Sequence, residues 1–264
     1  MTSYTHGHAE PVLRSHRWRT AENSAAYLLP HLRPGQRLLD VGSGPGTLTA
    51  DLAALVAPGE VTALEATPDA LGLTAAELER RGIRADLVVG DVHDLPFPDD
   101  AFDVVHAHQV LQHVADPVGA LRELRRVCRP GGLVAVRDAD YAGFTWWPRD
   151  PGLDTWLRLY DDAARANGGE PDAGRRLLGW ARAAGFPDPA ATASTWCFAT
   201  PEDREYWGGM WAERIVGSAL ADQLVAEGRC TPADLAAMAA AWRRWTADPD
   251  GWFVVLHGEV LAHP

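Results

Sequence analysis

The stretch that most constrains the fold is "LLDVGSGPGTLTA", residues 38–50. Three glycines, at positions 42, 44 and 46, follow an apolar run and precede a helical pattern. Glycine tolerates left-handed backbone conformations and lets a ligand approach the backbone closely. A strand, a glycine-rich turn and a helix in this order are typical of the ligand-binding turn of open α/β sheets. The sequence therefore predicts such a sheet, with a nucleotide-like ligand lying on its first turn.

The first half of the chain continues this alternation. Short apolar runs predict strands, and the segments between them have helical patterns with Thr67-Pro68 as one helix start. Buried, β-branched strands that alternate with helices indicate a parallel sheet covered on both faces. The expected strands are 36–41, 60–66, 85–91, 101–108 and 132–139, and the expected helices are 47–56, one from residue 67, and 117–128, closed by "RPGG".

The regular alternation of predicted strands and helices changes after Tyr141. Helices are expected at about 150–167 and 172–184, then a strand near 190–198, two helices that begin at "TPED" and "TPAD", and a last strand in "GWFVVLHGEVLAH". Ten of the eleven tryptophans lie at or beyond Trp146, which predicts an aromatic cap beside the core. These side chains either pack an added helical layer or face a ligand, since tryptophan is frequent in both settings.

Composition excludes several classes of protein. The net charge of −12 and the scattered arginines argue against nucleic-acid binding, which requires a clustered basic surface. No apolar run has transmembrane length, the start lacks a signal-peptide core, and Cys128, Cys197 and Cys230 suggest neither a disulfide framework nor a metal site. A cytoplasmic protein without membrane insertion is expected. The chain has no lysine, which excludes every mechanism that needs a lysine amine.

Asp40 narrows the choice of ligand. The chain matches the dinucleotide pattern G-x-G-x-x-G at Gly42 and Gly44, but Thr47 stands at its third glycine position. A carboxylate at the strand end would repel a pyrophosphate and attract a ligand with a positively charged tail. S-adenosylmethionine, with its ammonium and sulfonium, is such a ligand. The alternative for Asp40 is a turn or cap residue.

Two further acids stand at successive strand ends. Glu65 ends the second strand, at the position where an acid binds ribose hydroxyls. Asp91 ends the third strand, where its carboxylate can accept from an adenine amino group while the backbone N–H of Val92 donates to the ring. Three acids at the carboxyl ends of adjacent strands favour one ligand in the crevice along that edge.

Four segments carry a family resemblance. "LLDVGSGPGTLT", "VTALEATPDAL", "VVGDVHDLPFPDDAFDVVHAHQVLQHVADP" and "LRELRRVCRPGGLVAV" resemble class I S-adenosylmethionine-dependent methyltransferases. The branch related to the ubiquinone/menaquinone-biosynthesis methyltransferases is the most similar. The resemblance covers about residues 10–140. It implies a Rossmann-like, doubly wound, seven-stranded sheet whose last strand is antiparallel. The segment of about 50 residues between the last two strands, and the 141–185 region, depart from the family pattern.

The resemblance also implies which residues bind the cofactor. The glycine turn with Asp40 would hold the methionine part, Glu65 the ribose, and Asp91 with Val92 the adenine. Neighbouring residues of the turn, of the second strand end, of the fourth strand and of the N-terminal segment complete the expected set. The full set is Asp40, Gly42, Ser43, Gly44, Gly46, Glu65, Ala66, Asp91, Val92, His108 and Arg19.

Methyl transfer requires alignment of the acceptor and, for some acceptors, removal of a proton. His106, His108 and His113 lie in "VVHAHQVLQHV", where the methyl group should point. His108 is nearest the strand end and is the best candidate proton acceptor; the alternative is that it only packs beside the cofactor. No metal is expected, because the N-terminal histidines lack a ligand pattern.

The N-terminal segment, which contains Tyr4, His6, His16 and Arg19, is expected to close over the site. Tyr4 and His6 are therefore further catalytic candidates, and a loose chain end is the alternative. The expected organisation is one methyltransferase domain, 1–264: N-terminal flap and helix 1–30, cofactor-binding core 31–140, and helical cap segments 141–185 and 200–248.

The predicted function is methyl transfer from S-adenosylmethionine to a small, apolar or aromatic metabolite. Two alternatives stay open. One is an S-adenosylmethionine-binding protein with a non-methylating role, as a cyclisation catalyst or a binding module, because cofactor motifs report binding and not turnover. The other is a nicotinamide-dependent oxidoreductase, which Asp40 and the early third glycine disfavour. The sequence carries no indication of an oligomeric state.

Overall fold

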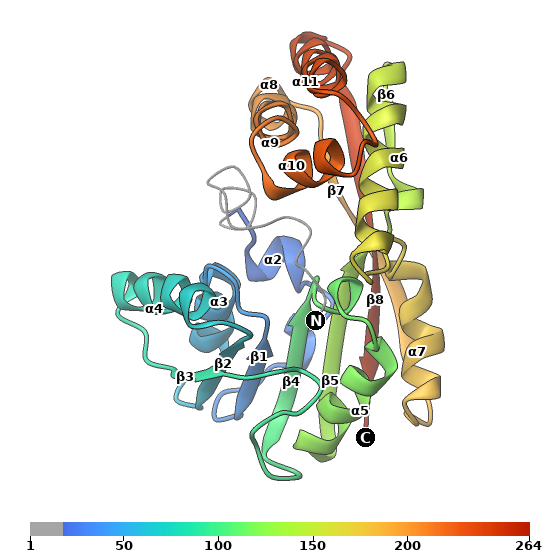
Figure 1. Ribbon diagram of the computed structural model, residues 1–264. Coiled ribbons are helices and arrows are strands. Elements are labelled where there is room, and N and C mark those ends of the chain that lie inside the picture. The colour runs from blue at the N-terminus through green and yellow to red at the C-terminus, as the bar shows by residue number, and fades with distance from the viewer. Residues whose placement is uncertain (1–17) are drawn as a thin grey trace.

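The computed structural model describes residues 18–264 and builds them around one mixed sheet (Figure 1). Its strands are β1 (Leu38–Val41), β2 (Val61–Glu65), β3 (Asp86–Val89), β4 (Phe102–His108), β5 (Cys128–Ala139), β6 (Thr145–Trp147), β7 (Ala190–Phe198) and β8 (Trp252–Ala262). Their order is β3-β2-β1-β4-β5-β8-β6, and β7 pairs with the free edge of β8.

The first five strands are parallel, and β8 runs antiparallel to β5, β6 and β7. This arrangement confirms the predicted α/β class with an antiparallel last strand. The sheet has one strand more than predicted, because β6 pairs three residues with the outer end of β8. A three-residue strand is too short to produce a recognisable alternation in sequence.

Helices cover both faces of the parallel strands. One face carries α2 (Ala21–Ser24) and α3 (Thr47–Val56), whose apolar side chains pack on Leu38 and Val104, and α4 (Pro68–Arg81) packs against α3. The opposite face carries α5 (Pro117–Val127) and α7 (Leu177–Ala183), which pack on Val105 and Val136. The carboxyl ends of β1 to β4 therefore open between two helical layers.

The tryptophans form a core of their own. The cap consists of α6 (Pro151–Ala166), α8 (Pro201–Arg204), α9 (Met210–Arg214), α10 (Ala219–Ala226) and α11 (Pro232–Ala247), packed around the outer halves of β7 and β8 (Figure 1). Trp156, Trp211 and Trp242 are almost completely buried, and the ring of Trp156 lies 4.6 and 4.9 Å from the other two. Packing of an added layer thus explains these rings.

Three features of the secondary structure differ from the sequence predictions. The helix α10 was not predicted, and the helix that begins at Pro201 passes through one π-helical segment, Glu205–Gly209, before α9. The "RPGG" residues lie inside β5, as a bulge between the pairs Phe102–Cys128 and Val104–Leu133. The sheet therefore resumes immediately after α5. The short helical turns are Leu29–His31, Leu111–His113, Tyr141–Gly143 and Gly174–Arg176.

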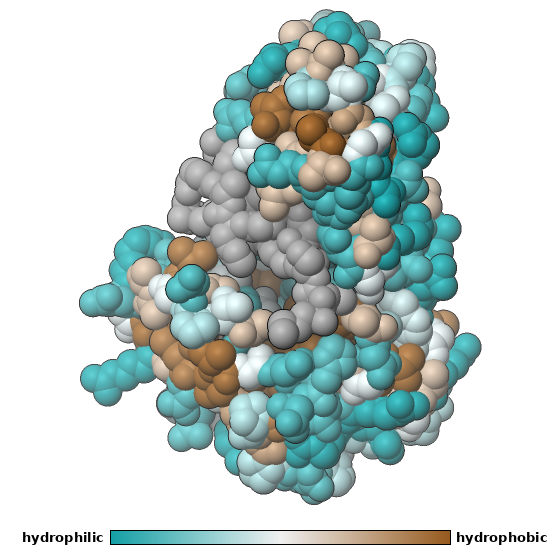
Figure 2. Space-filling view, in the orientation of Figure 1, coloured by the Kyte–Doolittle hydropathy of each residue, from teal (hydrophilic) through white to brown (hydrophobic). Residues whose placement is uncertain are grey.

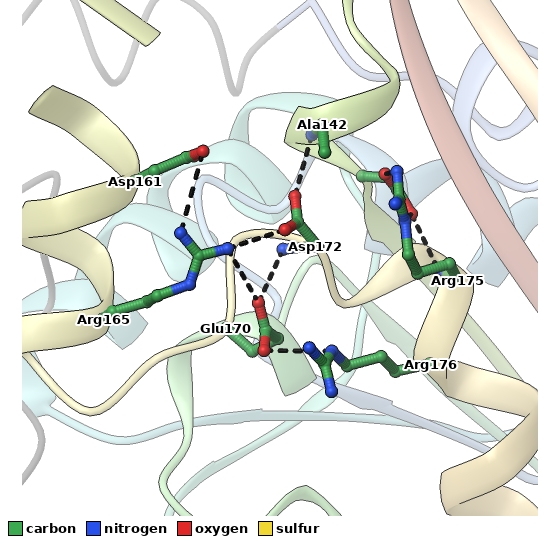
Figure 3. A network of polar contacts seen from close by, with 8 residues as sticks. Ala142, Asp161, Arg165, Glu170, Asp172, Arg175 and Arg176 are labelled. Carbon is green, nitrogen blue, oxygen red and sulfur yellow. Dashed lines mark hydrogen bonds and ion pairs between the residues drawn. The ribbon is translucent and has the colours of Figure 1, made fainter. Parts of the chain in front are cut away.

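A polar network joins the cap to the core where β5 ends (Figure 3). Arg165 of α6 donates to Asp172 over 2.6 Å and lies 3.8 Å from Asp161. Asp140, just after β5, accepts from the guanidinium of Arg175 over 2.5 and 2.7 Å. Since Asp172 also accepts from the backbone N–H of Ala142, the network ties three separate segments together.

Most of the surface in the view of Figure 2 is hydrophilic, with apolar groups in small separate patches. The large apolar side chains that are exposed include Leu87, Val89, Trp147, Val216 and Trp252. Within residues 18–264, no helix is both long enough and apolar enough to cross a bilayer.

Candidate functional site

A cavity of about 500 Å³ opens at the carboxyl ends of β1, β2, β3 and β4. This is the edge at which open α/β sheets bind their ligands, and the volume lies in the usual range for small-molecule sites, about 300–1,000 Å³. Its walls come from the four successive turns that follow these strands and from Arg19. They include Gly42, Gly44, Glu65, Ala66, Asp91, Val92, His108, Gln109, Val110 and His113.

The glycine turn begins the cavity wall. Gly42 has φ +73°, and a Cβ there would overlap the side chain of Val110, which lines the opposite side of the turn. Gly46 has φ +81° and lines neither the main cavity nor the small one beside it. A Cβ at Gly46 would press on the backbone of Thr74 in α4. The third glycine thus serves helix packing, while the first two serve the cavity.

Asp40 is buried behind this wall rather than facing the main cavity. Its Oδ2 accepts from the Thr49 hydroxyl over 2.5 Å, and its Oδ1 lies 2.7 Å from Nδ1 of the buried His106. A cavity of about 20 Å³, enough for one water, adjoins Asp40, Ser43 and Gly44. The carboxylate therefore links β1 to α3 and β4. It can interact with a ligand through the small cavity.

Glu65 lies in the main cavity, as the sequence predicts for a ribose ligand. Its Oε1 accepts from the backbone N–H of Gly44 over 2.6 Å, and its Oε2 accepts from that of Ala66 over 3.2 Å. Each carboxylate oxygen has two lone pairs, so further hydrogen bonds can be accepted. The contact with Gly44 also fixes the glycine turn against the end of β2.

Asp91 stands at the outer rim of the cavity with 71% of its side chain exposed. Its Oδ1 accepts from the backbone N–H of His93 over 2.9 Å and lies 2.8 Å from the ring Nδ1. These contacts lower the pKa of the Asp91 carboxyl, the backbone hydrogen bond most. An ionised acceptor is thus available at the end of β3, beside the mostly buried Val92.

His108 is the most buried polar side chain of the main cavity wall. It is 5% exposed, and neither ring nitrogen has a hydrogen-bond partner within the described part of the chain. Burial, with smaller effects from Arg19 and Arg137, holds the pKa of His108 well below its usual value. Its imidazole is therefore neutral at physiological pH and has a free lone pair next to the cavity.

Three polar side chains surround His108. Arg19 donates from Nη2 to Oε1 of Gln109 over 2.5 Å, and Nε2 of Gln109 lies 3.0 Å from Nε2 of the buried His257. Gln109 has φ +55°, a conformation that non-glycine residues seldom adopt and that clusters at functional sites. Of these three residues, Arg19 alone is among those predicted from sequence. Gln109 was missed because nothing local marks a residue that takes a left-handed conformation.

A buried charged pair lies one strand further along the same sheet face. Arg137 of β5 is opposite His108 of β4 in register and opposite Glu259 of β8, with Nε 3.2 Å from the Glu259 carboxylate. This pair was not predicted from sequence. An available indication was the i, i+2 spacing of His257 and Glu259 within the otherwise apolar "FVVLHGEVLA", which places both on one face of a buried strand.

The structure thus brings ten of the eleven predicted cofactor residues to the main cavity or its small neighbour, and the exception is Gly46. Two predicted catalytic residues, Tyr4 and His6, lie outside the described residues, as do His8 and His16. Between residues 18 and 264, no three His, Cys, Asp or Glu side chains are arranged to hold a metal ion.

The family described as "Methyltransferase domain" matches residues 39–136, from the first strand to the fifth. An uncharacterized methyltransferase of Schizosaccharomyces pombe is 34% identical, covering 98% of this chain and 95% of that protein. The ubiquinone/menaquinone biosynthesis C-methyltransferase of Vibrio campbellii is 36% identical over 137 residues, 49% of this chain and 48% of its own. The second match is confined to about half of each chain, in keeping with the divergent cap.

Two solved structures share the fold. The Haemonchus contortus phosphoethanolamine N-methyltransferase 2, in complex with phosphomonomethylethanolamine and S-adenosylhomocysteine, has a TM-score of 0.59 at 16% identity, covering 96% of this chain and 56% of that one. The [4+2]-cyclase SpnF has a TM-score of 0.53 at 24% identity, covering 94% and 80%. At these identities the likeness concerns architecture.

Proposed function

Because this chain belongs to the S-adenosylmethionine-dependent methyltransferases, we propose that it methylates a small metabolite bound between His108 and the cofactor. The observation that carries the proposal is the arrangement along one cavity: Asp91 and Glu65 lie at the ends of β3 and β2, and a buried histidine without a hydrogen-bond partner among residues 18–264 lies at the end of β4. Family membership removes the nicotinamide alternative.

We assign the cofactor contacts by position along that cavity. Glu65 accepts from the ribose hydroxyls, and Asp91 with the backbone N–H of Val92 binds the adenine edge. Gly42 and Gly44 leave room for the methionine part, and Asp40 acts on its ammonium through the small cavity beside Ser43. S-adenosylmethionine supplies a methyl group activated by a sulfonium.

His108 then serves the acceptor. Its neutral imidazole takes the proton of a hydroxyl, amine or carbon acid as the new bond to the methyl carbon forms. Val110 and Val114 give that end of the cavity an apolar wall, which supports an apolar or aromatic acceptor. Burial of the histidine excludes water, which would otherwise compete for its lone pair.

The wider organisation belongs to the same proposal. We treat 1–264 as one methyltransferase domain in which residues 1–30 close over the site; the structure describes this segment from Trp18 onward. A cytoplasmic location is supported by the three free thiols, Cys128, Cys197 and Cys230.

The test is product formation. The full chain is incubated with S-adenosylmethionine and a panel of hydroxylated, amino and carboxylic metabolites, and S-adenosylhomocysteine and the methylated product are quantified together. The two should appear in equal amounts with at least one acceptor. Tight cofactor binding with no S-adenosylhomocysteine formed, while an acceptor is cyclised or left unchanged, would favour the non-methylating alternative.

A further inference from the structure

Arg137 is a buried guanidinium in which two of the three nitrogens have no hydrogen-bond partner among residues 18–264. The side chain is 1% exposed, and its Nε lies 3.2 Å from both the Ser194 hydroxyl and the Glu259 carboxylate. Its Nη1 and Nη2 are also buried and have no hydrogen-bond partner in the described part of the chain. Buried polar groups are nearly always paired, so two unpaired nitrogens on one cation require an explanation.

Glu259 orients this guanidinium through Nε and does not bond to Nη1 or Nη2. The carboxylate accepts from the Thr192 hydroxyl over 2.8 Å and from the Ser194 hydroxyl over 2.5 Å, both on the neighbouring strand β7. It meets Arg137 only at Nε. The edge formed by Nη1 and Nη2 is therefore held in a fixed direction, and that edge matches the two oxygens of a planar carboxylate.

Two cations lie around the Trp196 ring. The guanidiniums of Arg19 and Arg137 lie 5.9 and 5.0 Å from the centre of that ring, and the acids that act on the nearby Tyr27 are Glu259, Asp138 and Asp40. Burial raises the pKa of Asp138 to about 7, and Asp40 is already paired with Thr49 and His106. Burial lowers the pKa of Arg137 to about 10, so it remains a cation at neutral pH. The nearby His108 and His257 are neutral, since burial holds the pKa of each well below its usual value.

Tyr27 supplies a further donor close to Arg137. Its hydroxyl is buried and without a hydrogen-bond partner among residues 18–264. Burial raises the pKa of this phenol well above its usual value, although the Arg137 charge acts in the opposite direction. Tyr27 belongs to the N-terminal segment that covers this part of the sheet, where the Asn23 carbonyl accepts from the Trp196 indole over 2.6 Å.

We propose that the Nη edge of Arg137 and the Tyr27 hydroxyl bind a carboxylate group of the methyl acceptor, beneath the segment Trp18–Tyr27. This inference rests on the proposed function and names the substrate class, a small carboxylic acid. Arg137 and His108 are opposite each other on adjacent strands, about 5 Å apart in the sheet. The carboxylate and the reacting atom therefore belong to one compact molecule.

The experiment uses two small probes of similar shape that differ in charge, so that charge and not shape decides the result. Full-length protein labelled with ¹⁵N-arginine and saturated with S-adenosylhomocysteine is titrated with acetate and, separately, with acetamide. The Nη resonances of Arg137, assigned by their loss in Arg137→Lys, should shift with acetate and not with the neutral amide. Arg137 resonances that do not respond to acetate would overturn the proposal, in wild-type protein whose folding is not in question.

A pair of variants measures how much Arg137 contributes to acetate affinity. Arg137→Gln should weaken acetate binding by about 10- to 100-fold, while Arg125→Gln, an exposed arginine on α5, should not change it. Equal acetate affinity in both variants would contradict the assignment. S-adenosylhomocysteine affinity is measured on every sample: its absence in wild type would refute the proposed function, whereas intact cofactor binding without an acetate response refutes the subsite alone.

Discussion

At the scale of single residues, the three acids of the cofactor site occupy three different environments. Asp40 is buried with partners on both oxygens, Glu65 is partly exposed and tied to the glycine turn, and Asp91 stands largely in solvent. Hydrogen bonds to a charged group gain strength as water is excluded. We therefore expect Glu65, which combines access to the cavity with partial shielding, to contribute most to cofactor affinity.

Glu65→Gln tests this expectation. The amide keeps the shape of the side chain but replaces one acceptor oxygen with a donor, so the ribose hydroxyls lose a charge-assisted partner. Affinity for S-adenosylhomocysteine should fall by about 1.5–3 kcal/mol, measured by calorimetry. Glu79→Gln, exposed at the end of α4, is the matched control. Wild-type affinity in Glu65→Gln would remove this residue from the cofactor site.

His108 gives a prediction on pH. Because burial holds its pKa well below 6.5, the folded protein keeps the neutral, proton-accepting form at mildly acidic pH. The kcat/KM should therefore not decline around pH 6.5, where a solvated histidine would acquire its proton. His108→Asn should lower kcat by about 10²- to 10⁴-fold, and His31→Asn, on an exposed turn, should not. A full rate in His108→Asn would show that this ring only packs beside the ligand.

At the scale of elements, the first turn of α3 and the middle of α4 meet at a glycine. Gly46 has a left-handed backbone, and a Cβ there would press on Thr74, whose hydroxyl donates to the Gly44 carbonyl over 2.7 Å. The same helix α4 contains Gly72, at which a Cβ would meet nothing. The two glycines thus have opposite consequences for stability.

Gly46→Ala should destabilise the protein by about 1–3 kcal/mol, through backbone strain and the displacement of α4. Gly72→Ala should stabilise it by about 0.5–1 kcal/mol, because alanine is the better residue in a helix interior. Both are measured by urea unfolding without cofactor. If Gly46→Ala unfolds like wild type, α3 and α4 do not depend on this close contact.

The elements also show which features the sequence could predict. Local rules located α3 at its observed bounds, and the Thr-Pro starts of α4, α8 and α11 are N-caps as expected. The hydrogen-bond partners of Asp40 could not be predicted from the sequence, because Asp40, Thr49 and His106 come from three elements that meet only in the folded protein. Arg137 and Glu259 are separated still further along the chain, and no spacing rule connects them.

At the scale of the whole molecule, two long strands join the parts. The inner residues of β8, such as Val260, pack in the α/β core, and its outer residues, such as Phe253, pack among the cap tryptophans. β7 pairs with β8 along this whole length. The cap is thus an extension of the sheet, and the polar network at the end of β5 forms a second joint (Figure 3).

Asp161 makes the stability of this polar network depend on pH. One carboxylate oxygen is buried without a hydrogen-bond partner among residues 18–264, and burial, with the nearby Asp172, raises the pKa to about 7 despite Arg165. An unfolded aspartate titrates near 3.8. The folded state therefore favours the protonated acid, and its contribution to stability is full below about pH 4 and is lost as the pH rises through about 7.

Asp161→Asn should remove this dependence, because asparagine resembles the protonated acid and cannot ionise. The variant should unfold at a higher temperature than wild type at pH 8, and the difference should shrink steadily towards pH 4, as measured by calorimetric scans across that range. Asp154→Asn, more than half exposed on the same helix, should show only a small shift that changes little with pH. A difference for Asp161→Asn that is constant from pH 4 to pH 8 would mean that this carboxyl is already ionised in the folded joint, with Arg165 outweighing burial.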